Sequence, residues 1–263
     1  MTLLMDRFQV ARFLRLQPWF AQLSPSQQER ITHGSFTVRG RRDQVMLPAR
    51  QHSEGWYAVM SGFVKLQSPG PAGRASAFLA LTGGEWFGEG SVMKEEPRRY
   101  EVVALRDSEL LCLPRARFQE LMATSLPFSH AVMNQLNLRL GQAMAIIETE
   151  RLCNLEQRLA LYLSRAFWHG LRRLNLSQEE LGLLAGMSRQ AANRGLKALA
   201  QRGLVCLKHG RVVSVDQAAI GRLLGQPETR PIEAAGQCDN TAHECSLDQQ
   251  RSGSPLAGVQ DRA

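Results

Sequence analysis

The sequence predicts an α+β fold with three consecutive parts: a β-rich domain, one long helix and a small helical domain. Residues 36–113 consist of short β-rich runs separated by turn residues. Within residues 128–150, apolar side chains recur in alternating steps of three and four residues, the heptad pattern of a pairing helix. Beyond residue 151, strands give way to short amphipathic segments. We therefore expect a β-domain at 1–125, a dimerisation helix at 126–150, a second domain at 151–225 and a disordered tail at 226–263.

The composition is that of a packed globular protein, with 263 residues and 44% hydrophobic side chains. The chain has no run of about eighteen apolar residues. Its N-terminal stretch MTLLMDRFQVARFLRLQ carries arginines throughout and lacks the apolar core of a signal peptide. The cysteines are 5 in number and scattered, which favours reduced thiols over a disulfide framework. We therefore expect a cytoplasmic protein with no membrane partner.

The net charge of +8 understates how basic the body of the chain is, because the tail at 226–263 is acidic. A basic body suggests a polyanionic partner, either nucleic acid or an anionic membrane surface, although charge alone fits mere solubility equally well. In the tail, Cys238, His243 and Cys245 are three candidate metal ligands without a fourth, so we expect no metal site there.

The β-domain is expected between two helical regions. Helical periodicity precedes it at residues 8–23 and resumes at residue 115, where a proline stands at a helix start. The strands expected between these regions are SFTVRG, VMLPA, WYAVMSGFVKLQ, ASAFLAL, YEVVAL and ELLCLP.

The long helix carries the heptad seam. Its members are Met133, Leu136, Leu140, Ala143 and Ile147. Such a seam predicts pairing with the same helix of a second copy. Packing of the helix on its own β-domain remains open, because five positions are few for a coiled coil.

Two short helices are expected around the dipeptide Gly186-Met187. Ser177 and Glu180 form a capping box that starts the first helix, and Ser188 caps the second. On a helical wheel the apolar residues of the second helix fall on one side and its hydrogen-bond donors on the other. The donor face consists of Arg189, Gln190, Asn193, Arg194 and Lys197.

This donor face has the chemistry needed to read DNA. Arg can give two hydrogen bonds to guanine, and Asn or Gln can pair with adenine in the major groove. Residues 171–225 also contain an excess of Lys and Arg, which suits phosphate contacts. A hairpin with its turn at His209-Gly210 follows as a candidate wing. The pattern favours a helix-turn-helix over an ordinary solvated helix face.

The whole arrangement resembles the Crp/Fnr family of bacterial transcription regulators over residues 8–224. The segments that carry the resemblance are WYAVMSGFVKL, GEWFGEGSV, LPRARFQELM and SQEELGLLAGMSRQAANRGLKAL. The resemblance implies an α+β fold with an N-terminal antiparallel, jelly-roll-like β-roll as a cyclic-nucleotide-binding-like sensor domain. A long dimerisation helix and a C-terminal winged helix-turn-helix would follow it.

The family also implies roles for the donor face. Residues matching Arg189, Gln190 and Arg194 read bases there, and a residue matching Ser188 or Ser177 contacts phosphate. Together with Asn193 and Lys197, these form the expected DNA-binding set. Gln190 stands where the best-known members have Glu, so the preferred half-site is expected to differ from theirs.

Residues 83–104, GGEWFGEGSVMKEEPRRYEVVA, match the phosphate-binding cassette of the family's β-roll. In nucleotide-binding relatives, backbone N–H groups and an Arg hold the cyclic phosphate while a Glu holds the ribose hydroxyl. The residues implied as ligand-binding are Gly88, Glu89, Ser91, Arg98 and Arg99.

The cassette departs from the family pattern after its first arginine. A small residue is expected there, but this chain has Arg99 followed by Tyr100, and GEGSV replaces an aliphatic turn. Three interpretations stay open: a cyclic nucleotide, a different small anion, or a retained scaffold that binds neither. A haem or iron–sulfur sensor is not expected, since this domain lacks a cysteine cluster.

The expected function is that of a homodimeric, sequence-specific DNA-binding transcription regulator with an effector-sensing β-roll. The expected partners are a double-stranded DNA operator, a second copy of the chain and RNA polymerase. No cofactor is assigned, and a cyclic nucleotide is the candidate effector. The alternatives are a DNA binder with a degenerate pocket and a cyclic-nucleotide-binding module that regulates an enzyme. The chain itself is not expected to be an enzyme, because no nucleophile–base pair, metal cluster or P-loop is evident.

Overall fold

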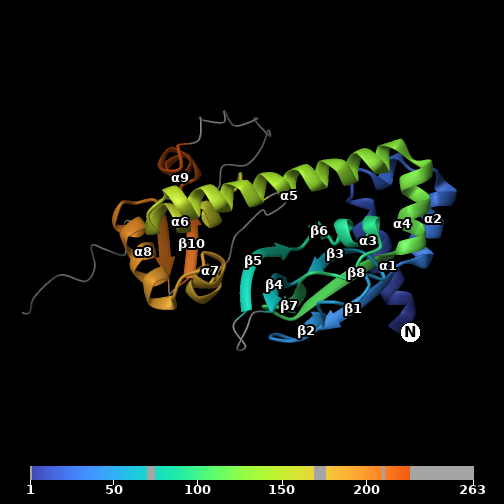
Figure 1. Cartoon of the computed structure of the whole chain (residues 1–263), viewed down its shortest axis with the longest axis horizontal. Coiled ribbons are helices and arrows are strands. Elements are labelled where there is room, and N and C mark those ends of the chain that lie inside the picture. Colours follow the sequence, from blue (N-terminus) through green and yellow to red (C-terminus); the bar gives the residue numbers. More distant parts are fainter. Residues whose placement is uncertain (1, 70–74, 169–175, 209–210, 226–263) are drawn as a thin grey trace, which may run out of the picture.

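The computed structural model describes residues 2–69, 75–168, 176–208 and 211–225, and it divides into a β-domain, a long helix and a C-terminal unit (Figure 1). Helix α5 (Leu126–Leu152) extends from the β-domain to the C-terminal unit. The predicted α+β fold is confirmed. The domain bounds given above remain predictions. The tail, with its expected disorder and its candidate metal ligands Cys238, His243 and Cys245, lies outside the described residues.

The N-terminal region differs from the single helix expected at residues 8–23. Helix α1 (Thr2–Arg15) ends before Pro18, which cannot continue a helix, and a short 3₁₀ helix η1 (Phe20–Gln22) follows. Helix α2 (Pro25–Gly34) was not expected. Ser24 caps its N-terminus, with a side chain that forms a capping box with Gln27.

The β-domain contains two four-stranded antiparallel sheets. Their strand orders are β1-β8-β3-β6 and β2-β7-β4-β5. The strands are β1 (Phe36–Gly40), β2 (Val45–Leu47), β3 (Gly55–Ser61), β4 (Phe63–Pro69), β5 (Ala75–Thr82), β6 (Trp86–Phe87), β7 (Glu101–Ala104) and β8 (Ser108–Pro114). The run WYAVMSGFVKLQ, expected as one strand, is broken at Gly62. Its φ of 92° and the 2.3 Å between an added Cβ and Ser108 Oγ both require glycine there.

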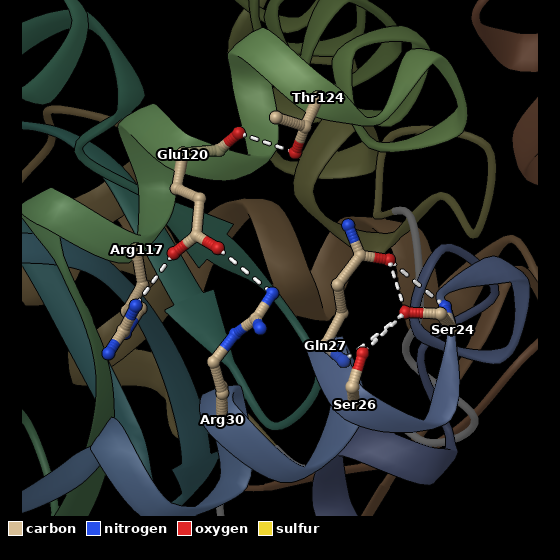
Figure 2. A network of polar contacts seen from close by, with 7 residues as sticks. All are labelled: Ser24, Ser26, Gln27, Arg30, Arg117, Glu120 and Thr124. Atoms are coloured by element: carbon tan, nitrogen blue, oxygen red, sulfur yellow. Dashed lines mark hydrogen bonds and ion pairs between the residues drawn. The ribbon is translucent and has the colours of Figure 1, made fainter.

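An aromatic cluster joins the N-terminal helices, the β-domain and the start of α5. The ring centroids of Trp56 and Trp86 lie 4.2 Å apart, and Trp19 packs edge-on against Phe128 at 5.0 Å. Helix α4 (Arg115–Thr124) packs beside α2. Figure 2 shows Glu120 of α4 between two arginines, accepting from Arg30 at 3.0 Å and from Arg117 at 2.7 Å. Val92 of the cassette helix α3 (Glu89–Lys94) and Phe128 of α5 belong to the same buried cluster as Trp56 and Trp86.

The C-terminal unit has the element order of a helix-turn-helix followed by a hairpin. Its elements are α6 (Leu155–Leu163), α7 (Gln178–Leu184), α8 (Arg189–Gln201), β9 (Val205–Lys208), β10 (Arg211–Val215) and α9 (Gln217–Leu223). Strands β9 and β10 pair antiparallel, while the expected turn at His209-Gly210 lies outside the described residues. Among the described residues, no helix is long and apolar enough to cross a membrane.

Candidate functional site

The helix-turn-helix is built by local capping. Ser177 Oγ accepts from the backbone N–H of Glu180 at 3.2 Å, and the Glu180 carboxylate accepts from the backbone N–H of Ser177 at 2.7 Å. Gly186 turns the chain with a φ of 62°, and Ser188 Oγ then accepts from the backbone N–H of Ala191 to start α8. A Cβ at Gly182 would lie 3.3 Å from the Ala192 Cβ, so glycine allows α7 and α8 to pack closely.

Helix α8 separates a packed face from a donor face, as its sequence predicts. Ala192, Leu196 and Leu199 are fully buried. On the opposite side the members of the donor face are exposed, except for the half-buried Asn193: Arg189, Gln190, Asn193, Arg194 and Lys197. Within the described part of the chain, Arg189, Arg194 and Lys197 form no ion pair. Their charges are therefore available to an external partner.

The two serines expected at the DNA backbone lie in different surroundings. Ser188 is exposed at the start of α8, beside the donor face. Ser177 is half-buried, and its backbone pairs with Arg211 at the start of the hairpin.

The cassette turn is set by Gly88, which precedes α3 with a φ of 92°. Glu89 is 6% exposed and accepts from the Trp56 indole N–H at 3.2 Å. Burial raises the pKa of Glu89 above its usual value, although hydrogen bonds and the charge of Arg139 oppose the shift. Ser91 is half-buried further along the same helix. The cassette therefore holds the carboxyl group of Glu89 at the start of α3, largely removed from water.

The two adjacent arginines point in different directions. The backbone of Arg98 pairs with the segment at Arg50 and Gln51 through bonds of 2.7 and 2.8 Å, which turns its side chain inward. The guanidinium lies 5.7 Å over the Tyr57 ring, and its Nη1 donates to the Pro48 carbonyl at 3.0 Å. Its Nε is buried without a hydrogen-bond partner.

Arg99 does not take the place expected for it. Its side chain is 84% exposed and lies 3.6 Å from Glu96. The chain bends at Arg99 and Tyr100, before β7 begins at Glu101. Arg99 is therefore a surface residue in this structure, and its expected role in ligand binding remains a prediction.

A cavity of about 230 Å³ opens between the cassette and α5. It is lined by Leu66, Phe78, Leu79, Phe87, Gly88, Glu89, Tyr100, Arg139, Gln142, Ala143 and Ile146. Tyr100 packs edge-on against Phe78, with ring centroids 5.7 Å apart. Burial first, and then the charge of Glu89, raise the pKa of Tyr100 above its ordinary value, so the phenol stays neutral. The polar side chains of the lining are Glu89, Tyr100, Arg139 and Gln142.

The contribution of α5 to this cavity was missed from sequence. Arg139 pairs with Glu85 at 3.2 Å, and also donates to the Trp86 carbonyl at 2.9 Å and to Gln142 Oε1 at 2.7 Å. Burial raises the pKa of Glu85, and Arg139 opposes that shift. Gln142 and Ala143 lie three and four residues after Arg139, and Ile146 lies four and three residues after them, so all four share one helix face. This spacing is a signal that could have found them.

The heptad seam of α5 faces away from the β-domain. Its large members are exposed to between 36% and 59%: Met133, Leu136, Leu140 and Ile147. Ala143 is also exposed, and it borders the cavity. The helix instead contacts its own β-domain through residues such as Gln135, which donates to the Trp86 carbonyl at 2.9 Å. The large side chains of the seam are therefore exposed in the single chain, and their pairing with a second copy remains a prediction.

Comparison with known proteins agrees with this geometry. Residues 38–125 match the family described as cyclic nucleotide-binding domain, and residues 157–223 match the Crp-like helix-turn-helix domain. The cyclic AMP receptor protein of Thermus thermophilus is 34% identical over 165 residues, which cover 62% of this chain and 76% of that protein.

A second relative, a CRP-like cAMP-activated global transcriptional regulator of Mycobacterium tuberculosis, is 24% identical over 211 residues, covering 77% of this chain and 94% of that protein. Among solved structures, a CRP/FNR-family transcriptional regulator from Thermus thermophilus superposes with a TM-score of 0.54. It is 23% identical, with 73% of this chain and 99% of that chain covered, so it supports the fold alone.

Proposed function

The chain belongs to the Crp/Fnr family of DNA-binding transcription regulators, and on that premise we propose that α8 reads an operator while the cavity beside α5 receives a small effector. The observation that carries the proposal is the donor face of α8. Arg189 and Arg194 are exposed and unpaired within the described residues, above a fully buried apolar face. Such a helix can enter the major groove and offer two-donor contacts to guanine.

Regulators of this family act as dimers, and the exposed seam of α5 is the surface we assign to the second copy. Pairing would remove its large apolar side chains from water. Two α8 helices related by the dimer axis would then meet successive major grooves about 34 Å apart. The operator is accordingly a near-palindrome of two half-sites.

The cavity residues fit an anionic effector only in part. Arg98 is a buried cation whose hydrogen bonds go to uncharged acceptors, the Pro48 carbonyl and the Ser53 hydroxyl. Its Nε–H has no partner and could donate to an anionic ligand. Glu89 is placed to accept from a ligand hydroxyl. Arg98 does not line the cavity, however, and the Tyr100 ring does. A cyclic nucleotide, the effector named for two relatives, would therefore have to move Tyr100 before its phosphate met Arg98.

RNA polymerase is the further partner in this proposal, because a regulator bound at an operator acts on the enzyme that transcribes beside it. The matched relatives are transcription regulators rather than enzymes. A role as an enzyme-regulating module is disfavoured by the helix-turn-helix match at residues 157–223.

Selection from a random duplex pool tests the proposal. The unmodified protein is expected to enrich a two-fold symmetric sequence, and repeating the selection with cyclic AMP or cyclic GMP asks whether either changes the enrichment. Arg41→Ala, at an exposed arginine of the β-domain, is the matched control and should enrich the same sequence. Recovery of unrelated sequences by the unmodified protein would contradict operator recognition.

A further inference from the structure

Two ion pairs join the β-domain to the first helix of the helix-turn-helix. Arg106, in the turn between β7 and β8, binds Glu180 of α7 in a two-point contact, Nε to Oε1 at 2.8 Å and Nη2 to Oε2 at 2.8 Å. The second pair is weaker, with Arg42 and Glu179 at 3.8 Å and both side chains exposed. Because two parallel hydrogen bonds join the guanidinium to the carboxylate, the Arg106–Glu180 pair fixes the relative orientation of the two side chains.

Arg106 is held in place from the β-domain side. Its guanidinium lies 5.3 Å over the Phe63 ring, and its backbone N–H donates to the Phe63 carbonyl at 3.3 Å. The Ser108 hydroxyl donates to the Arg106 carbonyl at 2.6 Å. The arginine is therefore a fixed point of the β-domain and not a mobile surface side chain.

Apolar packing accompanies the ion pair. Phe63 of β4 and Ala80 of β5, which are 3% and 1% exposed, belong to the same buried cluster as Leu181 and Leu184 of α7. Figure 1 shows α7 beside the edge of the β-domain at β5. The contact between the β-domain and α7 thus combines a buried apolar cluster with the partly exposed Arg106–Glu180 ion pair.

The C-terminal unit has its covalent attachment elsewhere. It follows α5 through Cys153 and Asn154, where the chain leaves one helix before α6 begins. On the α5 side, Gln142 also donates to the Phe167 carbonyl of this unit at 2.7 Å. The contact at Glu180 adds an attachment to the β-domain, and it further restricts the direction of α8 relative to α5.

Because α5 carries the dimer seam, the direction of α8 relative to α5 also sets the distance between the two α8 helices of a dimer. We propose that Arg106 is a positioning residue for operator recognition: by clamping Glu180 it fixes the spacing between half-sites that the dimer accepts. This inference rests on the proposed dimeric operator binding. It assigns the choice of spacing to a residue of the β-domain that lies outside the donor face.

The test uses full-length protein and operators whose half-site separation is changed by one or two base pairs in either direction. The variants are Arg106→Gln and Glu180→Gln, the second of which keeps an acceptor for the Ser177 backbone and so preserves the helix cap. The unmodified protein should prefer one separation by about tenfold or more, and both variants should reduce that preference to about threefold or less. Half-site sequence preference should stay unchanged.

Three controls separate positioning from a loss of structure. Arg202→Gln breaks the 2.7 Å pair with Glu156 inside the C-terminal unit, and it should leave the separation profile unchanged. Arg106→Lys keeps a charge without the two-point contact and should recover part of the preference. Urea unfolding should show all variants folded at the assay temperature.

The outcomes are distinguishable. Folded variants with the separation profile of the unmodified protein would overturn the inference and leave operator binding standing. An unmodified protein that selects no paired half-sites would overturn both. A profile flattened equally by Arg202→Gln would assign the effect to general loosening and contradict the role of Arg106.

Discussion

The side-chain amide of Gln142 donates a 2.7 Å hydrogen bond to the backbone carbonyl of Phe167. Gln142 lines the cavity under α5, while Phe167 belongs to the aromatic cluster of the C-terminal unit, packed edge-on against Tyr162 and Trp168. Gln142 also accepts from Arg139, which pairs with Glu85 of the cassette region. A continuous polar connection therefore runs from the cassette to the DNA-binding unit.

Gln142→Ala should lower the free energy of unfolding by about 1 to 3 kcal/mol, because it leaves the buried Phe167 carbonyl and one Arg139 donor without partners. Denaturant unfolding followed by tryptophan fluorescence measures the loss. Asn137→Ala, at an exposed position of the same helix, is the control and should change stability by less than about 0.5 kcal/mol. Equal stability of the two variants would show that the bond is replaced by water.

Arg194→Ala should weaken binding to the selected operator by about 1 to 3 kcal/mol and relax the preference at one base position. The reason is the loss of a two-donor contact from the donor face of α8. Titrations against operators with single-base changes provide the measurement. A uniform loss on every sequence would mean that Arg194 contacts phosphate only.

Tyr100→Ala should strengthen binding of cyclic AMP or cyclic GMP at least tenfold, about 1.4 kcal/mol, by clearing the ring from the cavity. For the unmodified protein, calorimetry should give a Kd no tighter than roughly 10 μM, about 7 kcal/mol. Arg99→Ser is the matched control, and it should leave the affinity unchanged because Arg99 points to solvent. Weaker binding by Tyr100→Ala would identify the phenol as a ligand contact.

Glu89→Gln should stabilise the protein increasingly as pH rises. Burial raises the pKa of Glu89 in the folded state, so the folded protein holds its proton more tightly than the unfolded chain. Its ionisation therefore costs stability as pH rises from the unfolded value near 4.5 through the higher folded value, and the cost persists above it. Unfolding free energies measured between about pH 4 and 8 should show that the stability gained by Glu89→Gln grows as pH rises. If Glu89→Gln stabilised the protein most at low pH, the pKa of Glu89 would be lowered by folding, which would contradict this account.

The features that the sequence predicts correctly follow from local rules. The caps at Ser177 and Ser188 and the two faces of α8 depend on residues three or four positions apart, so they can be read from the chain. The inward direction of the Arg98 side chain could not be predicted from local sequence, because it depends on backbone pairing with the distant segment at Arg50 and Gln51.

The same holds for α5. Its exposed seam is visible as a heptad, but the role of Arg139 in the cavity arises only when the helix lies across the cassette. Helix α2 begins from a local signal too, the capping box of Ser24 and Gln27, which lies beyond the helical periodicity of residues 8–23.

The central claim is that two copies joined through α5 read paired half-sites with α8, and sedimentation with a labelled operator tests it most directly. Leu140 is 59% exposed in the single chain, so Leu140→Glu should spare the fold while placing a charge in the seam. At micromolar concentration the unmodified protein should sediment as a dimer and bind one palindromic duplex with two chains, while Leu140→Glu should be monomeric and bind at least about tenfold more weakly. An unmodified protein that sediments as a monomer and binds single half-sites of unrelated sequence would contradict the account.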